Sequence, residues 1–332
     1  MANWVKLLTI VSIIIYFACC LSISADDTDI YQQRSNPSST SAKAKILVIL
    51  DNTKSSVSDD ISNLTFTIAK EVVGNIVISN PEIDFGLMVF NNNNSINADG
   101  GRIIKHLKSN MTSTERVNFI TSMQGVTESF STPLCESTYE AYLYLTGNQI
   151  KYGKQRSPTL DSPERDASAD NGSSYNSPIT DCAYTYIILL SDGEPSNDTN
   201  ANQLISALTG NTCSGSNGSC LPEIAEYMAN NDLDGDASNG EQYAITYTIG
   251  FTTDQKLLKD TAIKGKGEYF TADNSEELAV AFQEVISSIL ATDESFTSVS
   301  VAVDTFSRTE SRNEVFFAMF KPSNTIDWPG NI

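Results

Sequence analysis

Two short stretches of this chain are apolar almost throughout, and an acid follows each of them. Residues 46–50 read ILVIL and lead into Asp51, and residues 184–190 read YTYIILL and lead through a serine to Asp192. A half-exposed strand alternates apolar and polar residues, whereas a short run without that alternation is typical of a strand buried on both faces. The two runs therefore predict central strands of a sheet that helices cover on both sides.

From residue 45 to about 290 the chain alternates between strand-like and helix-like patterns. Further strands are expected at 83–90, 243–251 and 267–272, with an edge strand at 101–108. The helical segments are expected at 58–78, 113–123, 133–145, 200–210, 221–230, 253–265 and 275–290. This alternation predicts an α/β fold, a doubly wound and mainly parallel sheet with helices on both faces. Such sheets bind ligands beyond the carboxyl ends of their strands.

The first residues have the pattern of an export signal. Lys6 precedes an apolar run at 7–21, and small residues follow, so cleavage is expected near residue 25. The run is shorter than the roughly 20 residues of a membrane span, although an uncleaved N-terminal anchor is the alternative. No comparable apolar stretch follows, so the mature chain is expected to be exported and to have no membrane span.

Composition divides the remainder into three parts. A polar, flexible lead-in at 26–44 precedes the α/β domain at 45–291. An insertion at about 147–180 is rich in Ser, Asp, Asn and Pro, and is expected to be a surface insertion or a disordered loop. Residues 292–332 alternate again like strands, which predicts the start of a small β region leading to a missing C-terminal domain.

The chain is strongly acidic, with 41 Asp and Glu residues against 21 Lys and Arg residues. This balance argues against nucleic acid and against anionic membrane surfaces as partners. It suits an extracytoplasmic protein whose carboxylates hold hard cations.

Four cysteines remain after the signal segment, which in an exported protein predicts two disulfides with three possible pairings. Cys213 and Cys220 flank the short segment SGSNGS, so we expect these two to pair. Cys135 and Cys182 are then left to pair by elimination. Zinc spacing is absent from the cysteines, and His106 is the single histidine of the sequence, so a zinc site is not expected.

Oxygen-bearing side chains gather where the predicted central strands end. Asp51, Thr53 and Ser55 form a D-x-T-x-S motif after the first strand, Asp192 follows the second, and Thr132 lies just before a helix. Because parallel strands end at the same edge of a sheet, these loops are expected to converge. Two carboxylates and three hydroxyls suit Mg²⁺, Ca²⁺ or Mn²⁺. The alternative is that these residues only form turns and helix caps.

This constellation resembles the metal-ion-dependent adhesion site of the von Willebrand factor A (vWA) family, in which D-x-S-x-S joins a distal Thr and a distal Asp. The resemblance implies a Rossmann-like vWA fold and a cation held by Asp51, Thr53, Ser55, Thr132 and Asp192. The departure is Thr53, where the family usually has Ser. A partner's carboxylate would complete the coordination of the metal.

Later segments resemble a narrower family. Residues 243–251, 265–289 and 313–331, the last reading NEVFFAMFKPSNTIDWPGN, are similar to the PilY/PilC proteins of type IV pilus biogenesis and pilus-tip adhesion. The resemblance implies roles in pilus assembly, twitching motility and attachment to surfaces or hosts. It implies minor pilins, or a host or matrix protein with an acidic residue, as partners. It also implies a place in the periplasm, on the outer membrane or at the pilus tip of a Gram-negative bacterium.

A second acidic segment, NNDLDGDASNGE at 230–241, has the spacing of a calcium-binding EF-hand loop. Its candidate Ca²⁺ ligands are Asn230, Asp232, Asp234, Asp236 and Glu241. A strand pattern follows in place of the second helix, so a lone calcium loop is the most that the sequence supports. A solvated turn is the alternative.

Binding is favoured over catalysis. Asp192 and Glu194 can be imagined as the acid pair of a metal-dependent hydrolase, but no nucleophile and base accompany them in the sequence. The expectation is a protein that is not an enzyme. The alternatives are a secreted metal-dependent hydrolase and a secreted vWA ligand-binding protein unrelated to pili.

Overall fold

The computed structural model describes residues 43–54, 59–91, 100–154, 161–179, 184–236, 241–294, 319–320 and 330–331. The predicted signal segment and nearly all of the lead-in lie outside these residues. None of the described helices combines the length and the apolar character needed to span a membrane.

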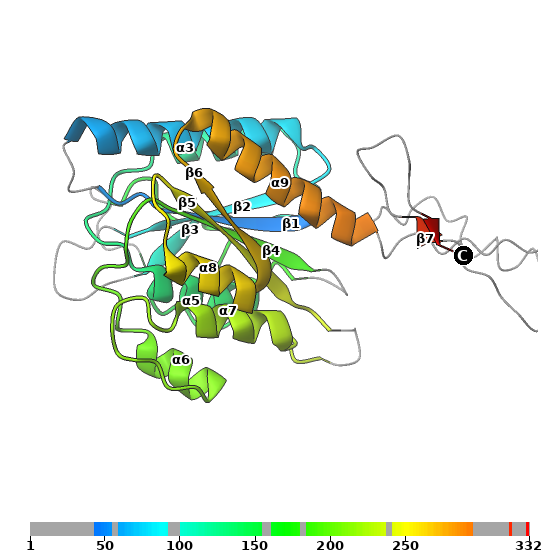
Figure 1. The fold of residues 1–332 in the computed structure, drawn as a ribbon. Coiled ribbons are helices and arrows are strands. Elements are labelled where there is room, and N and C mark those ends of the chain that lie inside the picture. Colours follow the sequence, from blue (N-terminus) through cyan, green and yellow to red (C-terminus); the bar gives the residue numbers. More distant parts are fainter. Residues whose placement is uncertain are drawn as a thin grey trace, which may run out of the picture. The chain divides into compact units, whose positions relative to one another are not determined.

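The described residues form a six-stranded sheet in the order β3-β2-β1-β4-β5-β6 (Figure 1). The strands are β1 (Lys45–Leu50), β2 (Asp84–Phe90), β3 (Gly101–Lys105), β4 (Thr185–Ser191), β5 (Ala244–Phe251) and β6 (Lys266–Ala272). All neighbours are parallel except β3, which runs antiparallel to β2 at one edge. The predicted doubly wound α/β class is confirmed, and the two apolar runs, β1 and β4, are its adjacent central strands.

Side chains of β1 alternate between two cores, which explains why the run has no polar position. Ile46, Val48 and Leu50 belong to the core on one face of the sheet, whereas Leu47 and Ile49 belong to the core on the other. All five are at most 1% exposed. Because successive residues of a strand point to opposite faces, a strand covered on both sides must be apolar at every position.

Helices cover both faces of the sheet (Figure 1). One core is completed by α3 (Asp59–Ser79), α4 (Ser113–Gln124) and α9 (Ser275–Glu294). The other is completed by α5 (Leu134–Leu145), α6 (Asn202–Thr209), α7 (Leu221–Asn230) and α8 (Lys256–Lys264). Each helix falls on a segment with predicted helical periodicity, and α9 continues to residue 294, past the expected domain boundary at 291.

The insertion at about 147–180 is more ordered than its composition predicts. Its residues 155–160 and 180 lie outside the described part, but 161–179 fold back onto the core. Tyr175 is 5% exposed, and its hydroxyl donates a hydrogen bond to Glu140 of α5 at 2.6 Å. A few buried side chains therefore anchor this part of an otherwise polar insertion.

The buried Arg102 of β3 holds the start of this segment. Its guanidinium donates to the carbonyl oxygens of Ser162 and Pro163 and lies 3.6 Å from the Asp161 carboxylate. It also donates to the carbonyl oxygen of Phe90 at 2.9 Å, which ties the segment to β2.

Within residues 295–332 the described residues are two short antiparallel strands, β7 (Met319–Phe320) and β8 (Gly330–Asn331). β7 falls within a segment that the sequence predicts as a strand. The rest of the expected β region lies outside the described residues.

Candidate metal centre

The two predicted acids meet because β1 and β4 are adjacent and in register. Leu50 is paired with Leu190, and the backbone N–H of Asp51 donates to the Leu190 carbonyl at 2.9 Å. Asp51 is therefore level with Ser191, and Asp192 lies one residue further along, just past the end of β4. Asp51 is 7% exposed, so its carboxylate lies at the floor of the site.

The Thr132 loop joins the segment after β1 through backbone contacts. Thr53 and Ser129 form an isolated parallel bridge, with Ser129 N–H donating to Asn52 O at 2.7 Å and Lys54 N–H to Ser129 O at 2.8 Å. The Thr132 hydroxyl then donates to the Thr53 hydroxyl at 3.1 Å. The structure therefore brings Asp51, Thr53 and Thr132 together, as the motif predicts.

Two hydrogen bonds fix the Asp51 carboxylate. The Thr53 N–H donates to Oδ1 at 2.8 Å, and the Ser191 hydroxyl donates to Oδ2 at 2.6 Å. Ser191 is the last residue of β4 and was not among the predicted site residues. In the sequence, the one signal for Ser191 is its position next to Asp192. Its contact with Asp51 could not be predicted from that position, because it depends on the pairing of β1 with β4.

The electrostatics of the site favour a bound cation. Burial and, to a lesser degree, the neighbouring charge of Asp51 together raise the pKa of Asp192 to about 7. Burial also raises the pKa of Asp51, against the hydrogen bonds from Ser191 and Thr53 that lower it. Among the described residues, neither carboxylate forms an ion pair with a base. A buried acid beside a half-buried one is costly without a countercharge, and a divalent cation would neutralise both.

The donor set fits a hard divalent cation, since every candidate ligand is a carboxylate or hydroxyl oxygen. Ser55, the fifth predicted ligand, lies outside the described residues. In the described part, groups of three or more Asp, Glu, His or Cys side chains with metal-holding geometry are absent. A site with two acids depends on hydroxyls and on outside ligands for the rest of its coordination.

A second pair of buried acids, which sequence reasoning missed, lies behind the Thr132 loop. The Asp198 carboxylate accepts hydrogen bonds from the N–H groups of Cys135 at 2.8 Å and Glu136 at 3.3 Å, in the first turn of α5. Glu136 and Asp198 are both 0% exposed. Burial raises the pKa of Glu136 to about 10, and the hydrogen bond to Asp198 acts in the same direction. Glu136 therefore keeps a proton near neutral pH, at the junction of α5 with the loop after β4.

This junction also supports the site. The Ser196 hydroxyl accepts a hydrogen bond from the Thr132 N–H at 3.0 Å, two residues before Asp198 in the same loop. Asn197 donates to the Ser131 hydroxyl at 3.0 Å. The loop after β4 thus positions Ser131 and the backbone of Thr132.

The predicted calcium loop does not assemble a ligand cluster in the described part. Asp232 accepts from Gln242 N–H at 3.0 Å, Asp234 from Asp236 N–H at 2.9 Å, and the Glu241 carboxylate from the Tyr243 hydroxyl. Asn230 donates to a carbonyl of its own helix. These are contacts of a polar turn, while residues 237–240 lie outside the described part. The calcium loop stays a prediction.

The predicted Cys213–Cys220 disulfide is confirmed. Cys135 is a buried free cysteine in α5. Cys182, its expected partner, lies outside the described residues, so the second disulfide stays a prediction that the structure does not show.

Comparisons with known proteins found similar solved structures. No protein-family model and no curated protein matches the chain. A von Willebrand factor type A protein from Catenulispora acidiphila matches with a TM-score of 0.44 and 15% identity, over 75% of this chain and 43% of that one. The proximal thread matrix protein 1 of the mussel byssus matches with a TM-score of 0.41 and 14% identity, over 74% and 47%.

A further form of the mussel protein, with a zinc-occupied MIDAS motif, matches with a TM-score of 0.37 and 13% identity, over 74% of this chain and 47% of that one. The chain spans less than half the length of these three structures. Its fold class rests on its own strand order, with helices on both faces of a mainly parallel sheet.

Proposed function

We propose that this chain is an exported ligand-binding module of vWA type, which grips a partner through a divalent cation at the carboxyl ends of β1 and β4. The observation that carries the proposal is the meeting of the buried Asp51 and the half-buried Asp192, which have no ion-pair partner among the described residues, beside the hydrogen-bonded hydroxyls of Thr53 and Thr132. Three separate chain segments supply these groups.

Asp51, Thr53, Thr132 and Asp192 would hold the cation, together with Ser55. Mg²⁺ or Ca²⁺ is the proposed ion in the cell, and Mn²⁺ is a suitable probe. When bound, the ion supplies a positive charge with a coordination position for a partner's carboxylate. The chain's own part is orientation: Ser191 and the Thr53 N–H fix the Asp51 carboxylate, and Ser196 holds the Thr132 backbone.

A more specific proposal is that the module belongs to a type IV pilus-associated protein. It would act in pilus biogenesis, twitching motility and attachment, at the outer surface of a Gram-negative bacterium. The support is the resemblance of residues 265–289 and 313–331 to PilY/PilC proteins. Its partners would be minor pilins, or a host or matrix protein that offers an acidic residue.

Calorimetric titration with Mn²⁺ tests the metal site. We expect one ion per wild-type chain, and no measurable binding by Asp51→Ala or Asp192→Ala. Glu71→Gln, a change at an exposed acid of α3, is the matched control and should bind like the wild type. Equal binding by all four proteins would refute the metal centre.

The pilus role needs a separate test in cells. Strains that carry Asp51→Ala or Glu71→Gln in the full-length protein would be compared for surface pili, twitching zones and attachment, with and without a chelator. Loss confined to Asp51→Ala supports the proposal. Normal piliation and attachment in a strain that lacks the gene would overturn the pilus role, while the metal titration would still stand.

We propose binding in preference to hydrolysis. His106, the single histidine of the sequence, bonds through Nδ1 to the Tyr144 hydroxyl at 2.8 Å, beside Leu107 at the end of β3. His106 is therefore bonded to Tyr144, away from Asp51 and Asp192, and is not placed to act as a base at the candidate site. A hydrolase screen with and without Mn²⁺ discriminates between the two, since metal-dependent turnover that disappears in Asp192→Ala would favour the enzyme.

A further inference from the structure

The lateral edge of the sheet formed by β6 has an unpaired side. In the described part of the chain β6 pairs with β5 on one side and with no strand on the other. An edge strand directs alternate N–H and C=O groups away from its sheet, where another extended chain can bond to them. β6 spans seven residues, long enough to receive a peptide of similar length.

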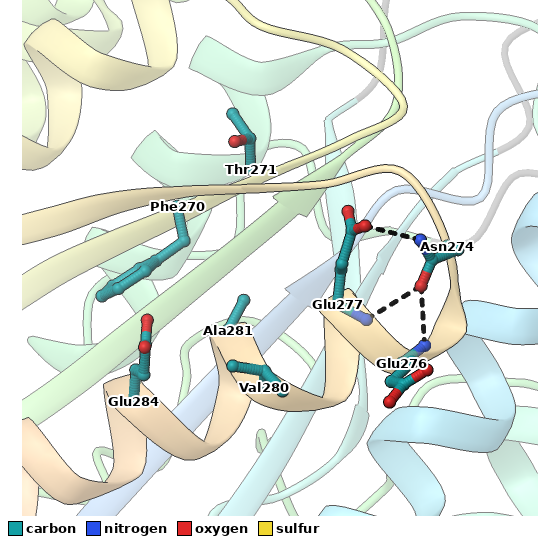
Figure 2. A pocket seen from close by; sticks show the side chains of 8 residues that line it. All are labelled: Phe270, Thr271, Asn274, Glu276, Glu277, Val280, Ala281 and Glu284. Atoms are coloured by element: carbon teal, nitrogen blue, oxygen red, sulfur yellow. Dashed lines mark hydrogen bonds between the residues drawn. The ribbon is translucent and has the colours of Figure 1, made fainter.

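A groove lies along this edge, between β6 and α9 (Figure 2). One hollow of about 370 Å³ is lined by Phe270 together with Val280 and Glu284 of α9, among others. A second hollow of about 460 Å³ shares these three residues, so the two lie next to each other between β6 and α9. Val280 is 49% exposed, which gives the floor of the groove an uncovered apolar patch.

The walls of the groove are acidic. Glu276, Glu277 and Glu284 of α9 and Glu268 of β6 line it. The α9 sequence contains no base, and in the described residues none of these four glutamates forms an ion pair. Lys266, the one base of β6, is directed elsewhere, because its ammonium donates to the carbonyl oxygen of Ala229 in α7.

An apolar floor with acidic walls suits long basic side chains. The aliphatic part of a Lys or Arg can cover Phe270 and Val280 while its charged end reaches the glutamates. In an extended peptide every second side chain faces the same way, so basic residues at alternate positions would enter the groove together. A second copy of this chain is a poor occupant, because each copy carries a net charge of −20.

We propose that the β6–α9 groove binds an extended basic segment of a partner protein, which adds to the sheet as a strand beside β6 with Lys or Arg at alternate positions. Strand addition uses backbone hydrogen bonds for affinity and alternate side chains for specificity. The groove shares no residue with the candidate metal centre, so this binding does not depend on the cation.

Fluorescence anisotropy with the full chain tests the proposal, using a labelled, capped (Lys-Thr)₄ peptide and a matched (Glu-Thr)₄ peptide. The basic peptide should bind and the acidic one should not. Charge reversal by Glu284→Lys should weaken binding about tenfold at low salt, since one attraction becomes a repulsion. Glu71→Lys makes the same charge change on α3 and should weaken it less than about twofold.

Two N-methylated peptides distinguish strand addition from attraction by charge alone. One carries methyl groups on the N–H groups of even positions and the other on those of odd positions. Because a strand presents alternate N–H groups to each side, one peptide should lose binding and the other should keep it. Equal binding of both, or equal weakening by Glu284→Lys and Glu71→Lys, would overturn the proposal. So would chain dimerisation through this edge in sedimentation experiments.

Discussion

Asp192 is the residue at which a proton and a metal ion compete. Its pKa is raised to about 7 by burial and by the charge of Asp51, so it is half protonated near neutral pH in the metal-free chain. A protonated carboxyl does not ligate a cation, so cation binding must release the proton.

We therefore expect the Mn²⁺ affinity to fall as the pH decreases below about 7, by up to about tenfold per pH unit. Above that pH the affinity should level off. Calorimetric titrations from about pH 5 to about pH 8.5 in buffers of different ionisation enthalpy would measure both the affinity and the proton release. A pH-independent affinity with no released proton would contradict this account of Asp192.

At the Glu136–Asp198 pair, protonation affects the free energy of unfolding, which is expected to fall as the pH rises. Glu136 keeps its proton in the folded chain up to about pH 10, whereas its ordinary value is 4.5. Between these values unfolding releases a proton, so the contribution of this carboxyl to the free energy of unfolding falls as the pH rises.

Glu136→Gln should remove that slope. The amide can donate to Asp198 and accept from the Asn200 N–H, as the protonated acid does, but it does not titrate. Urea unfolding should show a smaller loss of stability from about pH 6 to about pH 9 than in the wild type. Glu71→Gln is the control and should keep the wild-type slope. An unchanged slope in Glu136→Gln would show that Glu136 is not protonated in the folded chain.

Among the elements, β3 depends most on a single side chain. Arg102 is 0% exposed, and burial lowers its pKa to about 10, although Asp161 opposes the shift. Its guanidinium joins β2 to the segment at 161–163. Removing one partner of a buried ion pair leaves the other without compensation.

Arg102→Ala should lower the free energy of unfolding by about 3–5 kcal/mol. It should also open residues 161–179 to limited proteolysis, because their anchor is lost. Lys108→Ala, at an exposed ion pair with Glu115, should change the stability by less than about 1 kcal/mol. If Arg102→Ala unfolds at the same urea concentration as the wild type, the anchoring role is wrong.

For the whole molecule, a cation that binds only the folded state must stabilise it. At a free concentration a hundred times its dissociation constant, Mn²⁺ would add about 2.7 kcal/mol. In a domain of about 250 residues this raises the melting temperature by about 5–10 °C. Calorimetric melting of Asp192→Ala should show no such rise, and a similar rise in both proteins would indicate binding elsewhere.

The sequence predicts much of this architecture because its strongest signals are local. Strands such as β1 and β4 are recognised from apolar runs, and α4 from the helix-like pattern of residues 113–123. The convergence of Asp51, Thr132 and Asp192 follows from a general property of parallel sheets. These features need no knowledge of side-chain contacts between distant segments.

What the sequence does not reveal depends on such contacts. The order of residues 161–179 comes from Tyr175 and Arg102, whose partners are 35 and about 60 positions away. The bond between Ser191 and Asp51 spans 140 positions. In each case the role of a polar side chain depends on a neighbour that is distant in the sequence. From the local pattern alone, such a polar residue is predicted to be exposed to solvent.

The central place of β1 also determines how the domain would resist stretching. Its six residues are bonded on both sides, in register with β2 and with β4. A force along this strand therefore loads two ladders of hydrogen bonds in shear at once. Under tension along β1, both ladders would have to break together before Asp51 could leave the site.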